Sequence, residues 1–356
     1  MMRINILLKK IITLIFVLPL YLVAFLFSRG SLRVGYIPSQ TISRIALMLR
    51  NLSGADKKSL RWLIWFNDNC ISNKVIANAI KQYVHVYPAS LVKPLYDLFW
   101  KLKLDNFLVH DNEINSHDEK ESKLSIHQIL SSSEIEYCQE QLRINLKDCE
   151  RRLAILCVRD NLYDSLFRSD SIAFQLNHRN SDIQTFLELV QFLISEDYNV
   201  IRIGRHVRER ANFQSEFYWD YATSNIQSDL LDVYFFSIAK LCVSTRYGVD
   251  DLATLFRVPL FLFDHAEDLM CKDALFVHPK LFFRGEKRIL SMDEINFLKI
   301  SDFRTALDFE KVGVCFKSNT PKVLKNAMKE GLSLLRSGQL NSTQISTEWK
   351  KLVNDG

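Results

Sequence analysis

The sequence predicts an α/β fold in which parallel strands alternate with crossover helices. Short apolar runs and segments of helical periodicity alternate along the chain, as in βαβ units. The most compact unit contains strand 241–243, a turn with Ser244, Thr245 and Gly248, helix 250–256, and strand 259–263. In such a unit, turn amides and a helix N-terminus can bind a phosphate. We therefore expect two Rossmann-like domains and a nucleotide-containing ligand.

The first half of the chain shows one such alternation after residue 30. The expected strands are 32–37, 62–66 and 84–87, and the expected helices are 41–52, 73–80 and 91–102. A polar, aperiodic segment, Asp111 to Lys123, then predicts a surface loop. The helix-like segment 133–148 fits either half. We place the N-terminal Rossmann-like domain at 31–148.

The second half restarts the alternation at an apolar strand, 153–158, which ends at Arg159 and Asp160. Helix 181–196 has one apolar face, and Ser181 with Gln184 has the spacing of a capping box. Strand 199–203, closed by Gly204, and helix 228–239 lead into the compact unit. These elements predict a C-terminal Rossmann-like domain at 149–320 and a helical tail at 321–356 that includes an amphipathic helix at 327–335.

Composition limits the partners and the compartment. Formal charge is +5, with 48% hydrophobic and 24% charged residues, which indicates a globular protein and not the concentrated basicity of a nucleic-acid binder. The 7 cysteines never form a CxxC pair, and the 8 histidines show no HxH or HExxH spacing. We therefore expect a reducing compartment, no disulfide framework and no metal site.

The first 30 residues predict a membrane anchor helix. An uncharged run extends from Ile11 to Phe27 behind Arg3, Lys9 and Lys10, and no small-residue cleavage site follows it. We expect an uncleaved anchor that spans the inner membrane or lies in its inner leaflet, with the rest of the chain in the cytoplasm. Positive residues on both sides leave a periplasmic location open.

Polar residues follow three strands of the second half. They are Arg159 and Asp160, Gly204 and Arg205, and Ser244, Thr245 and Gly248. Ligands of open parallel sheets bind beyond the carboxyl ends of the strands, and guanidinium groups match phosphate oxygens. These residues predict a diphosphate site. The competing interpretation is that both arginines are solvated loop residues.

Three sets of residues have two interpretations each. Arg179 and Asn180 could face the cleft, or Asn180 could cap the following helix. Asp250 could bind a ribose or sugar hydroxyl, or it could only begin its helix. Asp160, Asp164 and His178 are candidate general bases, or solvated or capping residues. The absence of an Asp-x-Asp pair favours a mechanism without a metal.

An ordered set of segments resembles a family of bacterial glycosyltransferases of surface-polysaccharide biosynthesis. The segments are Leu32-Arg33-Val34-Gly35, Arg44-Ile45-Ala46, Ile71-Ser72-Asn73-Lys74, Val158-Arg159-Asp160, Arg179-Asn180-Ser181-Asp182-Ile183, Val200-Ile201-Arg202-Ile203-Gly204, and Ser244-Thr245 with Gly248, Leu255-Phe256 and Pro259. They cover most of the chain beyond residue 31. Arg246 and Tyr247 depart from the family pattern, because a small residue is expected before Gly248.

The resemblance implies a transferase of the GT-B type, similar to O-fucosyltransferases and heptosyltransferases with two Rossmann-like domains. The N-terminal half would bind a carbohydrate or lipid-linked acceptor, and the C-terminal half would bind a nucleotide-sugar donor. No other cofactor is implied. The departure at Arg246 and Tyr247 leaves an alternative: a non-catalytic, membrane-tethered binding or assembly component of a polysaccharide-synthesis complex.

Overall fold

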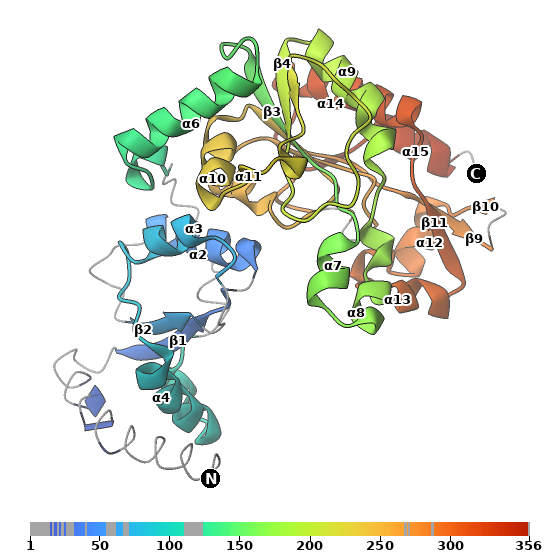
Figure 1. Ribbon diagram of the computed structural model, residues 1–356. Helices are drawn as coiled ribbons and strands as arrows, with labels where there is room; N and C mark the ends of the chain where they lie inside the picture. Colours follow the sequence, from blue (N-terminus) through green and yellow to red (C-terminus); the bar gives the residue numbers. More distant parts are fainter. Residues whose placement is uncertain are drawn as a thin grey trace. The chain divides into compact units, whose positions relative to one another are not determined.

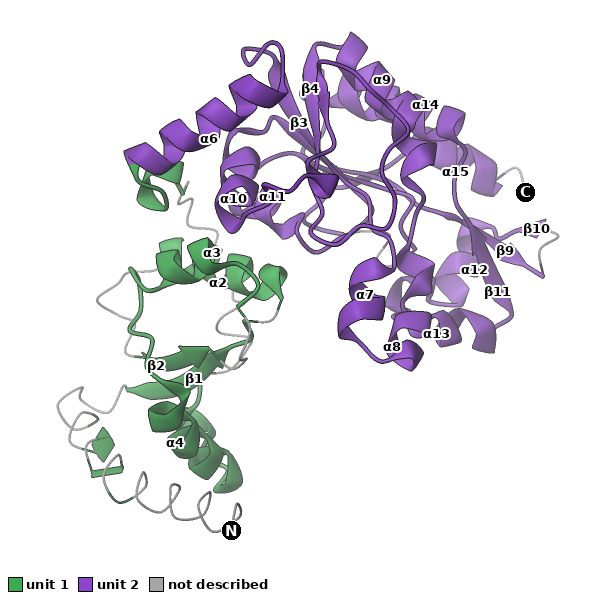
Figure 2. Cartoon of the chain, in the orientation of Figure 1, with its two compact units in different colours: residues 1–131 green, residues 132–356 purple. Residues whose placement is uncertain are grey.

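The chain consists of two compact units, residues 1–131 and 132–356 (Figure 2). The computed structural model describes residues 32–39, 41–54, 62–66, 71–109, 124–266, 271–285 and 288–354, together with Ile15, Leu18, Pro19, Tyr21, Leu22, Phe25 and Leu269.

Unit 1 is built on two parallel strands, β1 (Arg33–Ile37) and β2 (Trp62–Phe66). Helices α2 (Ile42–Gly54) and α3 (Lys74–Ile80) lie on one side of this pair, and α4 (Ala89–Lys101) lies on the other (Figure 1). Asn73 caps α3 by accepting a hydrogen bond from the Ile76 amide. A cluster of buried apolar side chains joins the strands to α4.

Two expectations for unit 1 change. The strand expected at 84–87 is wrong, because Val86 forms only an isolated parallel bridge to Ile64. Leu108 forms a second such bridge to Val34. Among the described residues, the sheet of unit 1 therefore has two strands, and the full Rossmann-like sheet expected for 31–148 is not found there.

The expected anchor at 1–30 lies outside the described residues, apart from six single positions. Within the described part of the chain, no helix combines the length and the apolar character that crossing a bilayer requires.

Unit 2 contains a parallel sheet of seven strands in the order β12-β8-β7-β6-β3-β4-β5. The bounds are β3 (Arg152–Cys157), β4 (Tyr198–Arg202), β5 (Tyr218–Trp219), β6 (Leu241–Ser244), β7 (Leu260–Phe263), β8 (Phe276–His278) and β12 (Gln344–Ile345). The chain starts in the middle at β3, moves outward through β4 to β5, and returns to the other side of β3 for β6, β7 and β8. This is the strand order of the Rossmann fold, with its reversal between β3 and β6. The Rossmann-like prediction for the C-terminal domain is confirmed.

Helices cover both faces of this sheet (Figure 1). On one face, α9 (Leu187–Ser195) and α14 (Pro321–Arg336) pack on Leu156, Val243 and Phe261 in a single apolar cluster. On the other face lie α10 (Asp229–Ile238) and α11 (Asp251–Leu255), and α6 (Ser132–Asn145) packs on α10. The sheet is buried on both faces, which explains why its strands are continuous apolar runs.

The expected capping box of helix 181–196 is wrong. The segment begins as a 3-10 turn, Ile183–Phe186, and Asp182 is its N-cap, accepting from the Gln184 amide at 2.8 Å. The Ser181 hydroxyl instead donates to the Asp264 carboxylate at 2.8 Å. Ser181 is therefore a link between two loops and not a cap.

The expected helical tail at 321–356 is not a separate segment. Helix α14 is part of the main core, and β12 extends the sheet beside β8. Helix α15 (Thr347–Asn354) packs into a second apolar cluster with a small antiparallel sheet. That sheet consists of β9 (Leu281–Arg284), β10 (Arg288–Ile289) and β11 (Val314–Lys317), with α12 (Met292–Phe297) and α13 (Ala306–Lys311) beside it, and the sequence analysis did not predict it.

Candidate functional site

The candidate site is the carboxyl edge of the seven-stranded sheet, at the reversal between β3 and β6. Two hydrogen bonds tie the ends of these strands together. The Thr245 amide donates to the Cys157 carbonyl at 2.9 Å, and the Arg159 amide donates to the Thr245 hydroxyl at 2.9 Å. Thr245 and the backbone of Arg159 are thus held side by side at the switch point, where open α/β sheets bind ligands.

The turn after β6 is filled by its own carboxylate. Asp250 is fully buried, and its side chain accepts hydrogen bonds from the amides of Tyr247 and Gly248 at 3.3 and 3.0 Å and from the Ser244 hydroxyl at 2.6 Å. Ser244 Oγ in turn accepts from the Arg246 amide at 3.0 Å. The amides expected to bind a phosphate therefore already have an anionic partner. Of the turn residues predicted to bind a phosphate, Ser244 contacts Asp250 through its hydroxyl and Gly248 through its amide in this conformation.

The backbone conformation of the turn bears on the two residues that differ from the family pattern, Arg246 and Tyr247. Arg246 has φ 66° and Gly248 has φ 85°, so this turn uses the left-handed region twice. Any side chain with a Cβ is disfavoured at φ 66°, so the backbone at Arg246 would suit glycine better than arginine. The Arg246 guanidinium lies 3.7 Å from the Asp251 carboxylate, so its charge is directed to the first turn of α11.

Arg159 is buried, and its guanidinium forms an ion pair with Asp164 of α7 (Leu162–Phe167). The other oxygen of Asp164 forms an ion pair with Arg168, whose Nε lies 2.9 Å from it. Asp164 is also buried, so one carboxylate holds two arginines at the end of β3. Arg168 is 40% exposed at its side chain and is the part of this triad that meets solvent. The solvated-loop interpretation of Arg159 is therefore wrong, and its charge is already paired.

Asp160 joins two loops. One oxygen accepts from the Leu162 amide at 2.9 Å and the other from the Arg208 amide at 2.5 Å. Next to this loop, Gly204 lies against Tyr247, because a Cβ at Gly204 would come within 3.3 Å of the Tyr247 ring. Asp160 is half-buried, and through Arg208 it holds the loop that begins at Gly204.

Arg205 belongs to a different group of charges. Its guanidinium pairs with Asp229 and lies 3.6 Å from Asp232, both in the first turn of α10. Burial raises the pKa of Asp232 to about 7, while Arg205 works in the opposite direction. Arg205 is 42% exposed at its side chain. Arg159 and Arg205 are therefore held by separate carboxylates, and the shared cationic cradle expected from the sequence is not observed among the described side chains.

A further polar cluster, not predicted from the sequence, lies at the ends of β7 and β8. The fully buried Asp264 accepts from the Asn319 amide at 2.7 Å and the Ser181 hydroxyl at 2.8 Å, and Lys280 Nζ lies 3.8 Å from it. Lys280 also donates to the Asn180 carbonyl at 2.5 Å, and burial lowers the pKa of its ammonium group. The charged residue directly after the apolar run ending at Phe263 was the available sequence signal.

His178 does not reach the candidate site. Its ring is fully buried, Nδ1 lies 3.1 Å from the Gln175 carbonyl, and Phe309 and Phe316 pack around it. This geometry gives His178 a packing role, contrary to the expectation of a general base. Arg179 and Asn180 follow it, half-buried, and Asn180 contributes its carbonyl to Lys280 and its side-chain amide to Asn177 rather than a helix cap.

The comparisons with known proteins add little to this geometry. No protein-family model and no curated protein matches the sequence. Among solved structures, E. coli ADP-heptose LPS heptosyltransferase II is similar over 65% of this chain and 84% of that chain, with 14% identity and a TM-score of 0.36. A likeness of this size carries nothing about activity, and the strand order above follows from the hydrogen bonds of unit 2 alone.

Among the described residues, no three histidine, cysteine or acidic side chains converge as metal ligands. The carboxyl edge offers instead two partly exposed arginines, Arg168 and Arg205, each held in place by buried carboxylates. Such an edge can orient an anionic ligand through cations of fixed position.

Proposed function

We propose that the chain is a glycosyltransferase of bacterial surface-polysaccharide synthesis. It would move a sugar from a nucleotide-sugar donor to a carbohydrate or lipid-linked acceptor. The observation that carries the proposal is the Rossmann strand order of unit 2, whose reversal between β3 and β6 bears Arg159, Asp160 and Thr245 at its carboxyl edge. The family resemblance of the sequence supports the same reaction.

In this proposal the donor diphosphate binds beside Arg168 and Arg205. Both guanidinium groups are partly exposed, and their carboxylate partners fix their positions before a ligand arrives. The acceptor hydroxyl oxygen attacks the anomeric carbon, and the bond from that carbon to the diphosphate oxygen breaks. The electron pair leaves with the nucleoside diphosphate, whose charge the arginines stabilise.

The hydroxyl proton must pass to a base, for which we retain Asp160. It is a half-buried carboxylate directly after β3, and each of its oxygens accepts one backbone amide. Those bonds fix the position of the carboxylate and leave lone pairs that can accept a proton. Asp250 and His178, by contrast, are enclosed by their own partners.

Donor turnover tests the proposal. The purified full-length protein is incubated with a panel of nucleotide sugars, and release of the nucleoside diphosphate is measured. We expect turnover of at least one donor, and a loss of roughly tenfold or more in Arg205→Gln, in line with the removal of a charge-assisted contact to a phosphate. Arg257→Gln is the matched control, because Arg257 is exposed and lies before β7, at the opposite edge of the sheet. Absence of turnover with every donor would contradict the proposal.

One observation favours a second candidate, a non-catalytic binding or assembly component. Asp250 occupies the amides of the turn after β6, so that turn is closed to a phosphate in this conformation. Replacement of Arg159 by Ala in the producing cell discriminates the two. A lost surface glycan with an unchanged protein level supports catalysis, and an unchanged glycan supports the assembly role.

Location at the inner membrane, with unit 2 in the cytoplasm, is part of the same proposal. It is supported by the uncharged run from Ile11 to Phe27 and by the scattered cysteines. Reporter fusions at the C-terminus test it, and a periplasmic C-terminus would remove the cytosolic nucleotide sugars as donors.

A further inference from the structure

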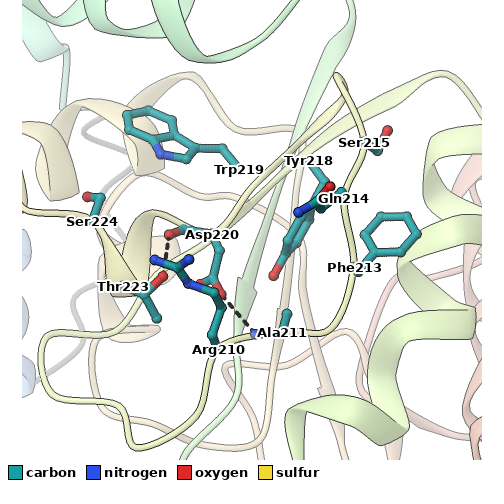
Figure 3. A pocket seen from close by; sticks show the side chains of 10 residues that line it. All are labelled: Arg210, Ala211, Phe213, Gln214, Ser215, Tyr218, Trp219, Asp220, Thr223 and Ser224. Carbon is teal, nitrogen blue, oxygen red and sulfur yellow. Dashed lines mark hydrogen bonds between the residues drawn. The ribbon is translucent and has the colours of Figure 1, made fainter.

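A cavity of about 360 Å³ lies beside β5, the edge strand of the large sheet, away from the β3–β6 switch point (Figure 3). Its volume falls within the range of small-molecule sites, roughly 300 to 1,000 Å³. Its wall comes from the loop before β5, from β5 and from the turn after it. The lining residues are Arg210, Ala211, Phe213, Gln214, Ser215, Tyr218, Trp219, Asp220, Thr223 and Ser224.

Buried polar contacts hold this wall in position. The Arg202 side chain, 1% exposed, donates from β4 to both carboxylate oxygens of Asp220 at 3.4 and 3.3 Å. Asp220 in turn accepts from the Ala211 amide at 3.0 Å (Figure 3). Gln184 donates to the Arg210 carbonyl at 3.0 Å and accepts from the Asn212 amide at 3.1 Å. The backbone from Arg210 to Asn212 is therefore held in place by hydrogen bonds to the side chains of Gln184 and Asp220.

The wall of the cavity carries polar side chains that can still form hydrogen bonds. Tyr218 is only 7% exposed, yet its hydroxyl has no hydrogen-bond partner among the described residues. Its phenol oxygen points toward the hollow beside Ala211 (Figure 3). Arg210 is exposed, and no ion pair of its guanidinium is found in the described part of the chain. A buried hydroxyl without a partner is costly, so this arrangement indicates a ligand.

The chemistry of these groups selects the ligand. Burial, with a smaller contribution from Asp220, raises the pKa of Tyr218, so its hydroxyl stays protonated and can donate. Arg210 supplies a positive charge and a fork of donors, while the carboxylate of Asp220 is already neutralised by Arg202. The exposed Gln214 amide can both donate and accept. This combination fits a polyhydroxylated ring that carries one acid group.

We propose that this cavity is a binding site for an acidic sugar, distinct from the donor site at the switch point. Arg210 binds the carboxylate or phosphate of the sugar, and Tyr218 and Gln214 bind its hydroxyls. The choice of a sugar as the bearer of the acid group rests on the proposed function; the anion-binding character rests on the cavity itself.

Direct binding tests the proposal, by calorimetric titration of the full-length protein with D-glucuronic acid, glucose 6-phosphate, glucose, acetate and inorganic phosphate. We expect both acidic sugars to bind and glucose to bind at least tenfold more weakly. Arg210→Gln should weaken the acidic sugars by at least tenfold, and Tyr218→Phe by severalfold with the ring packing retained. Arg208→Gln is the matched control, because Arg208 is equally exposed but does not line the cavity.

Three results would overturn the proposal. They are equal binding of glucose and glucuronic acid, acetate or phosphate binding as tightly as the acidic sugars, and the same loss in Arg208→Gln as in Arg210→Gln. The proposed function is tested separately, by measuring turnover of nucleotide-sugar donors. Binding that depends on Arg210 in a protein without turnover supports the cavity and contradicts the transferase.

Discussion

At the scale of single residues, Asp250 decides how the turn after β6 is built. It is fully buried and accepts from two backbone amides and one hydroxyl. Asp250→Ala would leave the Gly248 amide and the Ser244 hydroxyl without their acceptor, at about 1 to 3 kcal/mol for each buried group left unsatisfied, while the Tyr247 amide keeps Ser244 Oγ at 3.3 Å. We expect the melting temperature to fall by roughly 5 to 15 °C.

Asp250→Asn keeps one carbonyl oxygen at this position, so we expect a smaller fall. Glu310→Gln, at an exposed position of α13, is the control and should leave the melting temperature unchanged. An unaltered melting temperature in Asp250→Ala would show that the turn finds other partners, which would reopen it as a phosphate site.

Asp232 makes the stability of the protein depend on pH. Burial raises the pKa of its carboxyl to about 7 in the folded chain, above the ordinary value of 3.8. Between pH about 4 and pH about 7, Asp232 therefore carries a proton in the folded state and has lost it in the unfolded state. The contribution of Asp232 is fully present below pH about 4 and is lost as pH rises through about 7.

The measurement is the unfolding free energy from pH 4 to pH 8, compared between the wild type and Asp232→Asn. We expect the difference between the two proteins to change by at least about 1 kcal/mol across this window, with the wild type losing stability as pH rises. A constant difference would mean that Asp232 is ionised throughout, held by Arg205.

His278 affects the pH dependence of stability in the opposite direction to Asp232. Burial lowers the pKa of its imidazole to about 4, and its ring is fully buried with Nε2 3.3 Å from Asn319 Oδ1. A lowered histidine pKa contributes stability above about 6.5 that is lost as pH falls through about 4. His278→Gln should therefore remove a loss of stability on acidification. A wild type and a variant that respond equally to acid would contradict this assignment.

At the scale of elements, strands β3, β4, β6 and β7 of the main sheet were predictable because their short apolar runs are bounded by polar residues. Strand 241–244 and the strand before Asp264 both follow this pattern. The two- and three-residue strands β5, β8 and β12 were not predicted, because they are too short to form such a run. Segment 84–87 (Val-His-Val-Tyr) also consists of residues that favour strands, but it contributes one bridge, because strand pairing depends on a neighbour that the local sequence does not specify. The strands of the antiparallel sheet around β9 are short and only partly buried, so their sequences do not form the apolar runs that predict a strand.

The candidate site was predictable in position but not in its contacts. Residues that follow strands gather at one edge by topology, and Arg159, Thr245 and Gly204 do so. Their pairing depends on side chains from other elements. Asp229, at the start of α10, forms an ion pair with Arg205, which follows β4. Ser181 donates a hydrogen bond to Asp264, which follows β7. Spacing along the chain carries no signal for such contacts.

Gly331 shows how closely α14 approaches the sheet. A Cβ at this position would lie 2.8 Å from Phe261 Cε2 and 3.0 Å from two atoms of the Phe276 ring. Alanine is a better helix former than glycine by about 1 kcal/mol, yet overpacking a core costs about 1 to 3 kcal/mol. We expect Gly331→Ala to destabilise unit 2 in chemical denaturation.

The control is Ser333→Ala, at an exposed position of the same helix. It should be neutral or slightly stabilising, because it gains helix propensity without meeting another side chain. Equal effects of the two substitutions would mean that the aromatic rings shift at no cost and that the close approach is not a constraint.

At the scale of the whole molecule, the division between the units falls before α6, not at residue 148. Ile135, Cys138 and Leu142 of α6 are buried, and this helix packs on α10. The chain after α6 is also fixed to unit 2. The Lys147 amide donates to the Glu216 carbonyl at 3.0 Å, and the Asn199 side chain donates to the Asp148 carbonyl at 2.6 Å. Helix α6 is therefore part of the fold of unit 2, although its sequence fits either half.

Two truncated chains test this division. Residues 132–356 retain the seven-stranded sheet, both apolar clusters and α6, so we expect them to fold alone and to unfold in one cooperative step. Residues 149–356 lack α6 and expose the face of α10 beneath it. Loss of three buried side chains at about 1.5 to 3 kcal/mol each predicts a destabilisation of roughly 5 to 9 kcal/mol, a large part of the roughly 5 to 15 kcal/mol that stabilises an ordinary domain. Equal unfolding free energies of the two chains would contradict the boundary before α6, because α6 would then contribute nothing to the unit that it covers.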